Sequence, residues 1–213
     1  MTPMNNKSYL KKIGILGGTF NPVHNGHLIL AENAKIYCGL DKVLFIPSGV
    51  SYLKDASLIV DKQHRLKMCE LAIRGHKDFE LSTVETDRSG DSHTYKTLDI
   101  LCKNYPDAHF YLITGADTFL FMGNWVKPEE IFSGCTVVCA MRDAHSAAEL
   151  ETAAKCYEEQ YGADIVIMDS KEVDISSSAI REMLAAGMDC SDYLDKDVIE
   201  YIKENDLYGN DRY

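Results

Sequence analysis

The chain has 213 residues, which is long enough for one α/β domain with a substantial buried core. Its net charge of -11 argues against a broad binding surface for nucleic acid or anionic membrane, so we expect neither partner. No apolar stretch approaches the roughly 20 residues of a membrane span, and residues 1–10 lack an apolar signal core. Seven cysteines without a C-x-x-C pair indicate reduced packing residues. Together these features predict a cytoplasmic protein.

Apolar runs and helical periodicities alternate along the chain. Strands are predicted over residues 12–17, 42–47, 78–82, 109–114, 135–140 and 164–168. Helices are predicted over residues 26–38, 62–74, 94–104, 146–160, 177–186 and 195–205. This alternation predicts an α/β fold, a Rossmann-like, doubly wound parallel sheet with helices on both faces. We treat residues 1–213 as a single domain with a small C-terminal helical part at about 174–213.

The first predicted strand ends in a turn that is suited to a polyphosphate. Gly17 and Gly18 let the backbone approach a ligand, and the helix that follows presents free amide groups to an anion. His24 and His27 stand where that helix begins, and imidazole can donate to phosphate oxygens near neutral pH. The small Gly26 lets both rings converge on one site. A glycine pair alone is equally typical of a tight turn with incidental histidines, but the His-x-Gly-His pattern is far more specific.

A serine run near the C-terminus could supply the second half of this site. Ser176, Ser177 and Ser178 precede an amphipathic pattern, and Arg181 follows about one turn later. The simpler interpretation is a helix N-cap. The hydroxyls, the free amides and Arg181 together also make an anion site, and a polyphosphate held by one helix start needs a second group of ligands.

Three further residues are candidates for binding a nucleoside or an aromatic ring. Asp117 follows the fourth strand and could cap the next helix or accept hydrogen bonds from ribose or adenine. Trp125, the only tryptophan, is either a core residue or a stacking surface. Thr94 is expected to cap the helix over residues 94–104.

The longest stretch without a predicted element covers residues 48–61. A loop of this length is usually functional, and this one carries Lys54. The next helix, over residues 62–74, begins with Lys62-Gln63-His64-Arg65, and we interpret its basic face as solvated.

Together these motifs resemble a known superfamily. The chain is similar to the H-x-G-H nucleotidyltransferases in two segments, Gly17-Gly18-Thr19-Phe20-x-Pro22-x-His24-x-Gly26-His27 and Ile175-Ser176-Ser177-Ser178-x-x-Arg181. Within this superfamily it resembles the bacterial nicotinate-nucleotide adenylyltransferases in Pro47-Ser48-Gly49-Val50, Gln63-His64-Arg65-x-x-Met68, Ser92-His93-Thr94-Tyr95-x-Thr97-Leu98, Gly115-Ala116-Asp117, Trp125 and Tyr201-Ile202-x-Glu204-x-x-Leu207-Tyr208. The resemblance spans residues 11–208, nearly the whole chain.

The resemblance implies an enzyme that transfers AMP from ATP to nicotinate mononucleotide. The products would be nicotinate adenine dinucleotide and pyrophosphate, in NAD biosynthesis. The acceptor phosphate would attack the α-phosphorus in line, so positioning and charge neutralisation would carry the catalysis. Mg²⁺ would bind with ATP as cofactor, because no carboxylate cage is visible in the sequence. The partners would be the two substrates, and a homo-oligomer is left open.

The resemblance also assigns roles to individual residues. The catalytic residues would be His24, His27 and Arg181, and no residue would bind a metal. ATP would contact Gly17, Gly18, Thr19, Phe20, Gly115, Asp117, Ile175, Ser176, Ser177 and Ser178. Nicotinate mononucleotide would contact Lys54, Thr94, Trp125 and Arg142.

The chain departs from the family pattern at three places. Asn21 stands where Asp is frequent, Ser51-Tyr52-Leu53-Lys54 replaces Pro-Pro-His-Lys or Pro-Pro-His-Arg, and His93 replaces a tyrosine. These departures concern the acceptor side more than ATP. Two rivals stay open at this stage: a pantetheine-phosphate adenylyltransferase, and a catalytically silent nucleotide-binding module, although the latter has no need of transition-state groups.

Overall fold

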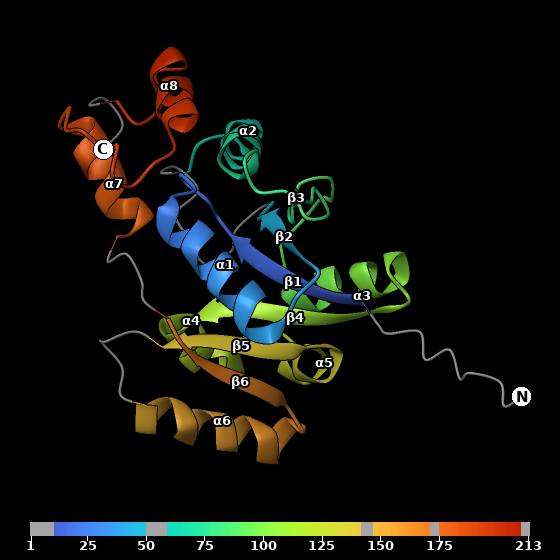
Figure 1. The fold of residues 1–213 in the computed structure, drawn as a ribbon. Helices are drawn as coiled ribbons and strands as arrows, with labels where there is room; N and C mark the ends of the chain where they lie inside the picture. Colours follow the sequence, from blue (N-terminus) through green and yellow to red (C-terminus); the bar gives the residue numbers. More distant parts are fainter. Residues whose placement is uncertain (1–10, 50–58, 142–146, 171–174, 210–213) are drawn as a thin grey trace, which may run out of the picture.

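The centre of the molecule is a six-stranded parallel sheet. The structure, a computed structural model, describes residues 11–49, 59–141, 147–170 and 175–209. The strands are β1 (Lys11–Gly18), β2 (Lys42–Pro47), β3 (Phe79–Leu81), β4 (Ala108–Gly115), β5 (Thr136–Met141) and β6 (Asp164–Asp169). Their spatial order is β3-β2-β1-β4-β5-β6 (Figure 1), and every neighbouring pair is parallel. The direction of winding therefore reverses between β1 and β4.

Helices cover both faces of this sheet. On one face, a core cluster unites the strands with α1 (Asn25–Cys38), α2 (Lys62–Ile73), α7 (Ser177–Ala185) and α8 (Lys196–Glu204). On the other face, a second cluster contains residues of α3 (Thr94–Asn104), α4 (Ala116–Phe121), α5 (Pro128–Gly134) and α6 (Ala147–Tyr161). In β1, Ile13 and Ile15 belong to one cluster and Leu16 to the other, as the two-residue period of a strand requires. The predicted doubly wound α/β fold is confirmed.

Each strand and helix predicted from the sequence is present, with small shifts at the ends. The prediction missed α4, α5 and a 3-10 turn at Met122–Asn124 between them. Helices of six and seven residues are too short to show a helical repeat of apolar residues. Helix α5 begins with Pro128 after Lys127, whose φ of 57° turns the chain sharply into the helix.

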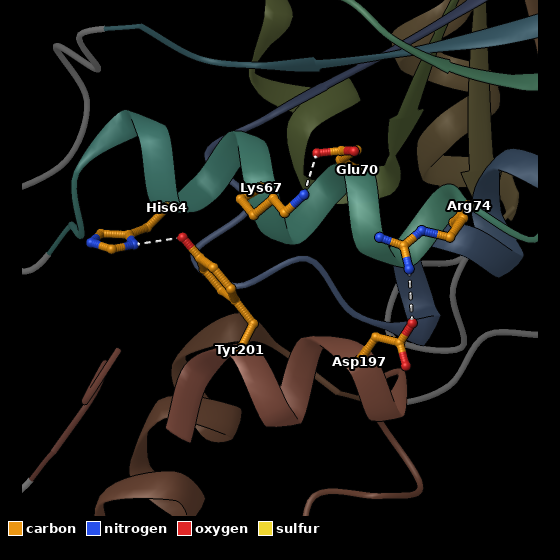
Figure 2. A network of polar contacts seen from close by, with 6 residues as sticks. All are labelled: His64, Lys67, Glu70, Arg74, Asp197 and Tyr201. Atoms are coloured by element: carbon orange, nitrogen blue, oxygen red, sulfur yellow. Dashed lines mark hydrogen bonds and ion pairs between the residues drawn. The ribbon is translucent and has the colours of Figure 1, made fainter. Parts of the chain in front are cut away.

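Helix α8 is held on α2 by apolar and polar contacts. Val198 and Ile202 are buried in the core cluster below it. Figure 2 shows two contacts between these helices, Tyr201 with His64 and Arg74 with Asp197. The Tyr201 hydroxyl is 2.9 Å from His64 Nδ1, and the Arg74–Asp197 ion pair measures 3.3 Å. The C-terminal helices thus share a core with α1 and α2. Among the described residues, no helix combines the length and the apolar character needed to cross a bilayer.

The seven cysteines are free thiols, and their exposure predicts their reactivity. Burial raises the pKa of the Cys135 thiol to about 12, and it also raises the pKa of Cys69. Because the thiolate is the reacting form, these two should resist alkylation by iodoacetamide at about pH 8. The exposed Cys102 and Cys156 should react in the native protein. Peptide mass mapping before and after unfolding checks this, and labelling of native Cys135 would contradict the burial.

Candidate active site

A cavity of about 520 Å³ lies where three strands end. The carboxyl ends of β1, β2 and β4 reach it through Gly18, Ser48 and Gly115, at the place where the winding reverses. Open α/β sheets bind their ligands at this position, and the volume is typical of a small-molecule site. The cavity brings together the following predicted site residues: Gly17, Gly18, Thr19, His27, Thr94, Gly115, Asp117 and Trp125.

The two histidines stand against each other at the start of α1. Their ring centroids are 3.7 Å apart with planes inclined by 39°. The backbone N–H of His24 donates to His27 Nδ1 at 3.2 Å, so the proton of a neutral His27 ring lies on Nε2. His27 lines the cavity, whereas His24 is 7% exposed and stands at the N-cap position of α1. Of the two imidazoles, it is therefore that of His27 that lies at the cavity wall.

Small residues make this packing possible. A Cβ atom at Gly26 would lie 3.0 Å from His24 Nδ1 and 3.7 Å from a methyl carbon of Ile175. At Gly17 a Cβ would meet nothing within 4 Å, so this backbone faces open space in the cavity wall. Phe20 is buried and does not line the cavity; its ring packs edge-on against His27 at 5.0 Å. Phe20 therefore supports the His27 ring on the side away from the cavity.

The serine run forms the N-terminus of α7, and it meets the turn after β1. Ser176 is the N-cap and accepts from the backbone of Ala179 at 3.1 Å. The Ser177 hydroxyl donates to the Pro22 carbonyl at 2.9 Å, and Arg181 donates to the Asn21 carbonyl at 3.0 Å. The second nitrogen of Arg181 contacts the Ser178 hydroxyl at 3.2 Å. Ser177 and Arg181 thus contact the turn that leads to the two histidines, and the residues of the serine run lie outside the cavity lining.

The acceptor-side residues are placed only in part. Thr94 lines the cavity, but the N-cap of α3 is His93, so the prediction that Thr94 caps this helix is wrong. A chain that is extended at His93 makes Thr94 the first helical residue. Trp125 is half-buried: it lines the cavity and packs against the core. Lys54 and Arg142 lie outside the described residues.

Asp117 lies in the first turn of α4 and is exposed at the cavity. The N-cap of this helix is Gly115, so Asp117 does not have the capping role that the sequence allowed. Its carboxylate lines the cavity at the end of β4. It is therefore placed where hydroxyl or amino groups of a ligand could reach it.

Sequence reasoning missed polar residues on the acceptor side of the cavity. Glu85 and Ser92 line it; Glu85 accepts from the Thr97 hydroxyl at 2.7 Å, and Ser92 accepts from the Gly49 backbone at 2.9 Å. Ser92 begins one of the family motifs and Glu85 lies in none, but no local pattern shows these two contacts, because each joins residues at least 12 positions apart. The basic face of α2 is not wholly solvated as interpreted: Arg65 is 2% exposed.

The comparisons with known proteins identify the class and the family of this chain. A model of the cytidylyltransferase-like family matches residues 15–183, which defines the class as a nucleotidyltransferase. A probable nicotinate-nucleotide adenylyltransferase of Streptococcus pyogenes serotype M1 is 35% identical over 95% of this chain and 90% of its own length. One from Clostridium botulinum is 34% identical over 93% of this chain and 98% of its own length.

A solved structure shares the fold. Plasmodium falciparum nicotinic acid mononucleotide adenylyltransferase complexed with NaAD aligns with a TM-score of 0.79 over 95% of this chain and 98% of that one, at 20% identity. The chain belongs to the nicotinate-nucleotide adenylyltransferase family and is an enzyme of the nucleotidyltransferase class.

Replacing Gly26 by alanine should lower turnover without unfolding the protein. The added Cβ would press on His24 at 3.0 Å and so displace the histidine pair. We expect kcat to fall by about 10-fold or more, because small misplacements are costly in such sites. The matched control is Gly75→Ala, whose Cβ would meet nothing within 4 Å. Steady-state kinetics and thermal unfolding test both variants, and equal kcat in the two would contradict the packing argument.

Proposed function

We propose that this protein transfers AMP from ATP to nicotinate mononucleotide, with the residues of the cavity and the adjoining helix starts as its site. The products are nicotinate adenine dinucleotide and pyrophosphate, a step of NAD biosynthesis. One observation carries this proposal: the phosphate-type turn with His27 and the aromatic wall with Trp125 line the same cavity. A transfer between two nucleotides needs both substrates in one space.

ATP would lie along the carboxyl end of β1. The backbone at Gly17 and Gly18 allows close approach. Gly115 and Asp117 line the cavity at the end of β4, where they would contact the adenosine. His27 Nε2 would donate to a phosphate oxygen of ATP, and His24 would act next to it. Ser176, Ser177, Ser178 and Arg181 would bind the β and γ phosphates from the start of α7.

The chemistry asks little of the protein beyond alignment and charge stabilisation. The phosphate of nicotinate mononucleotide is already a competent nucleophile and attacks the α-phosphorus in line, without a covalent enzyme intermediate. Negative charge then builds on the bridging and leaving oxygens. Donors fixed before the reaction, such as His27 and the amides of α1, stabilise this charge without reorganising.

The nicotinate end would lie between α3 and Trp125. The first amides of α3 begin at Thr94 and carry the positive end of the helix dipole, which suits a carboxylate. The indole of Trp125 offers a flat apolar face to the pyridine ring. Lys54 and Arg142, outside the described residues, are our candidates for the mononucleotide phosphate.

Mg²⁺ would arrive with ATP. This ion takes oxygen ligands and commonly binds through substrate phosphates with few protein carboxylates. Among the described residues, no group of three or more His, Cys, Asp or Glu side chains is placed to hold a metal ion. An ion bound to the phosphates would shield the triphosphate charge.

The organisation of the chain follows from shared packing. Residues of α7 and α8 belong to the same core cluster as α1 and α2, which supports one nucleotidyltransferase domain over the whole chain. The net charge of -11 supports small-molecule partners rather than nucleic acid or membrane. A cytoplasmic location completes the proposal.

An acceptor panel tests the proposed reaction. We expect the purified protein to release pyrophosphate from ATP and Mg²⁺ only when nicotinate mononucleotide is added. Nicotinamide mononucleotide, measured alongside, gives the preference for the carboxylate, and phosphopantetheine represents the rival enzyme. Equal turnover with phosphopantetheine, or none with any acceptor, would refute the proposal. Product mass spectrometry confirms the dinucleotide.

Replacing His27 by alanine should lower kcat by a factor on the order of 10² or more, because one preorganised donor to the reacting phosphate is removed. The substitution also removes a side chain from the cavity wall, so the thermal unfolding of the variant is measured as well. His76→Ala is the matched control: it precedes β3, at the opposite end of the strands from the cavity, and stacks on Phe79. An unchanged kcat in His27→Ala would remove His27 from the mechanism.

A further inference from the structure

A buried arginine connects two sides of the cavity. We call them the ATP wall, with Gly17, Gly18, Thr19 and His27, and the acceptor wall, with Ser48, Glu85 and Ser92. Arg65 lies in the first turn of α2 and is 2% exposed. Each nitrogen of its guanidinium donates to a different backbone carbonyl: Nε to Val60 at 3.2 Å, NH1 to Thr19 at 2.9 Å and NH2 to Gly49 at 3.3 Å. These acceptors come from separate parts of the chain, so one side chain fixes them relative to one another.

The carbonyl of Thr19 belongs to the ATP wall of the cavity. Thr19 lines the cavity beside Gly17, Gly18 and His27, directly after β1. The turn here carries Phe20 at a φ of 49°, a conformation that needs support from its surroundings. Arg65 supplies a charged donor to this turn from outside.

The carbonyl of Gly49 belongs to the acceptor wall. Its neighbour Ser48 lines the cavity, and the backbone N–H of Gly49 donates to Ser92, which also lines it. Gly49 cannot be replaced easily, because a Cβ there would lie 2.6 Å from the Glu85 carbonyl oxygen. This wall is therefore tightly packed on one side and tied to Arg65 on the other.

Val60 links the same junction to a third part of the chain. Its carbonyl accepts from Arg65, while its N–H donates to Asn21 Oδ1 at 3.2 Å. The Tyr208 hydroxyl donates to the same Asn21 oxygen at 2.8 Å. Asn21 is 4% exposed, so this departure from the family pattern is a structural contact and not a ligand-facing group.

We propose that Arg65 is a positioning residue that aligns the phosphate-binding turn with the acceptor wall. This inference rests on the proposed function. Arg65 does not line the cavity, and its guanidinium is engaged by carbonyls, so it acts through Thr19 and Gly49 and not on the substrates. Its planar fork can address three fixed acceptors at once, which the single ammonium of a lysine cannot do in the same geometry.

The burial of Arg65 agrees with this role. Desolvation lowers the pKa of its guanidinium, although an arginine stays charged at working pH. A charge is removed from water only where strong hydrogen bonds compensate for it. Here three backbone carbonyls compensate for the lost water by accepting hydrogen bonds from Arg65. These bonds form only when the two walls are correctly placed, and they hold the walls in that place.

Two substitutions and one control test the proposal. Arg65→Lys keeps the charge, and Arg65→Met keeps much of the volume. Met68→Ala opens a cavity in the core on the same helix and removes none of the three hydrogen bonds of Arg65. Each variant is compared with the original protein for thermal unfolding, for kcat and KM, and for the Kd of ATP and of the acceptor measured singly. Rates are measured only at temperatures at which the near-UV circular dichroism of each variant shows folded protein.

We expect Arg65→Lys to lower kcat by about 10- to 100-fold, because the reacting groups are no longer in line. The separate Kd values should change little, since each wall still binds its own substrate. Met68→Ala should lose thermal stability but keep kcat. If Arg65→Met does not fold, Arg65→Lys decides the question alone.

Other outcomes overturn the proposal. An unchanged kcat in Arg65→Lys, or a loss of stability alone as in Met68→Ala, would make Arg65 only a structural residue. The Arg65 variants are assayed with whichever acceptor the original protein uses in the acceptor panel. If that acceptor is not nicotinate mononucleotide, the proposed function is refuted, but the variants still test Arg65. If the original protein turns over no acceptor, both proposals are refuted.

Discussion

The site depends on a buried turn whose carbonyl groups have no sheet partner. Between β1 and α1, residues 20–24 are buried, so the polar backbone there must find hydrogen bonds within the protein. Side chains supply them: Arg181 donates to Asn21 and Ser177 to Pro22, while Arg65 donates to Thr19 directly before these residues. Two helices from distant parts of the chain, α2 and α7, thus converge on one turn.

This requirement explains why the two signature motifs occur together. The motif at the start of α7 lies more than 150 residues from the turn, yet Ser177 and Arg181 contact its backbone directly. These residues would be needed to hold the turn even before any phosphate is bound. A variant at Arg181 therefore changes both the shape of the turn and the charge beside it, and its kinetic effect cannot be assigned to phosphate binding alone.

The sequence predicts the sheet and the location of the site, but not the contacts that hold the site together. Alternating apolar runs predict β1 to β6 and the long helices, because burial imposes those periods. The sequence does not predict helices α4 and α5, because they are too short to show a helical repeat of apolar residues. Arg65 lies in a family motif, but the sequence does not predict its burial or its contacts, since a hydrogen bond to a distant carbonyl leaves no local pattern. The resemblance assigned the histidines, and the fold explains Gly26 beside them.

The charges around the cavity indicate how it can attract phosphates despite the acidic chain. Among its described lining residues, the ionisable carboxyl and imidazole groups are His27, Glu85 and Asp117, and neither arginine nor lysine is present. In the described part of the chain, sources of positive potential beside this lining are Arg181 and the N-termini of α1, α3 and α7. Helix dipoles act over the length of about one turn, so they are useful only when the helix starts stay in place. Holding the walls in register is therefore itself an electrostatic requirement, which joins the role of Arg65 to that of the histidine pair.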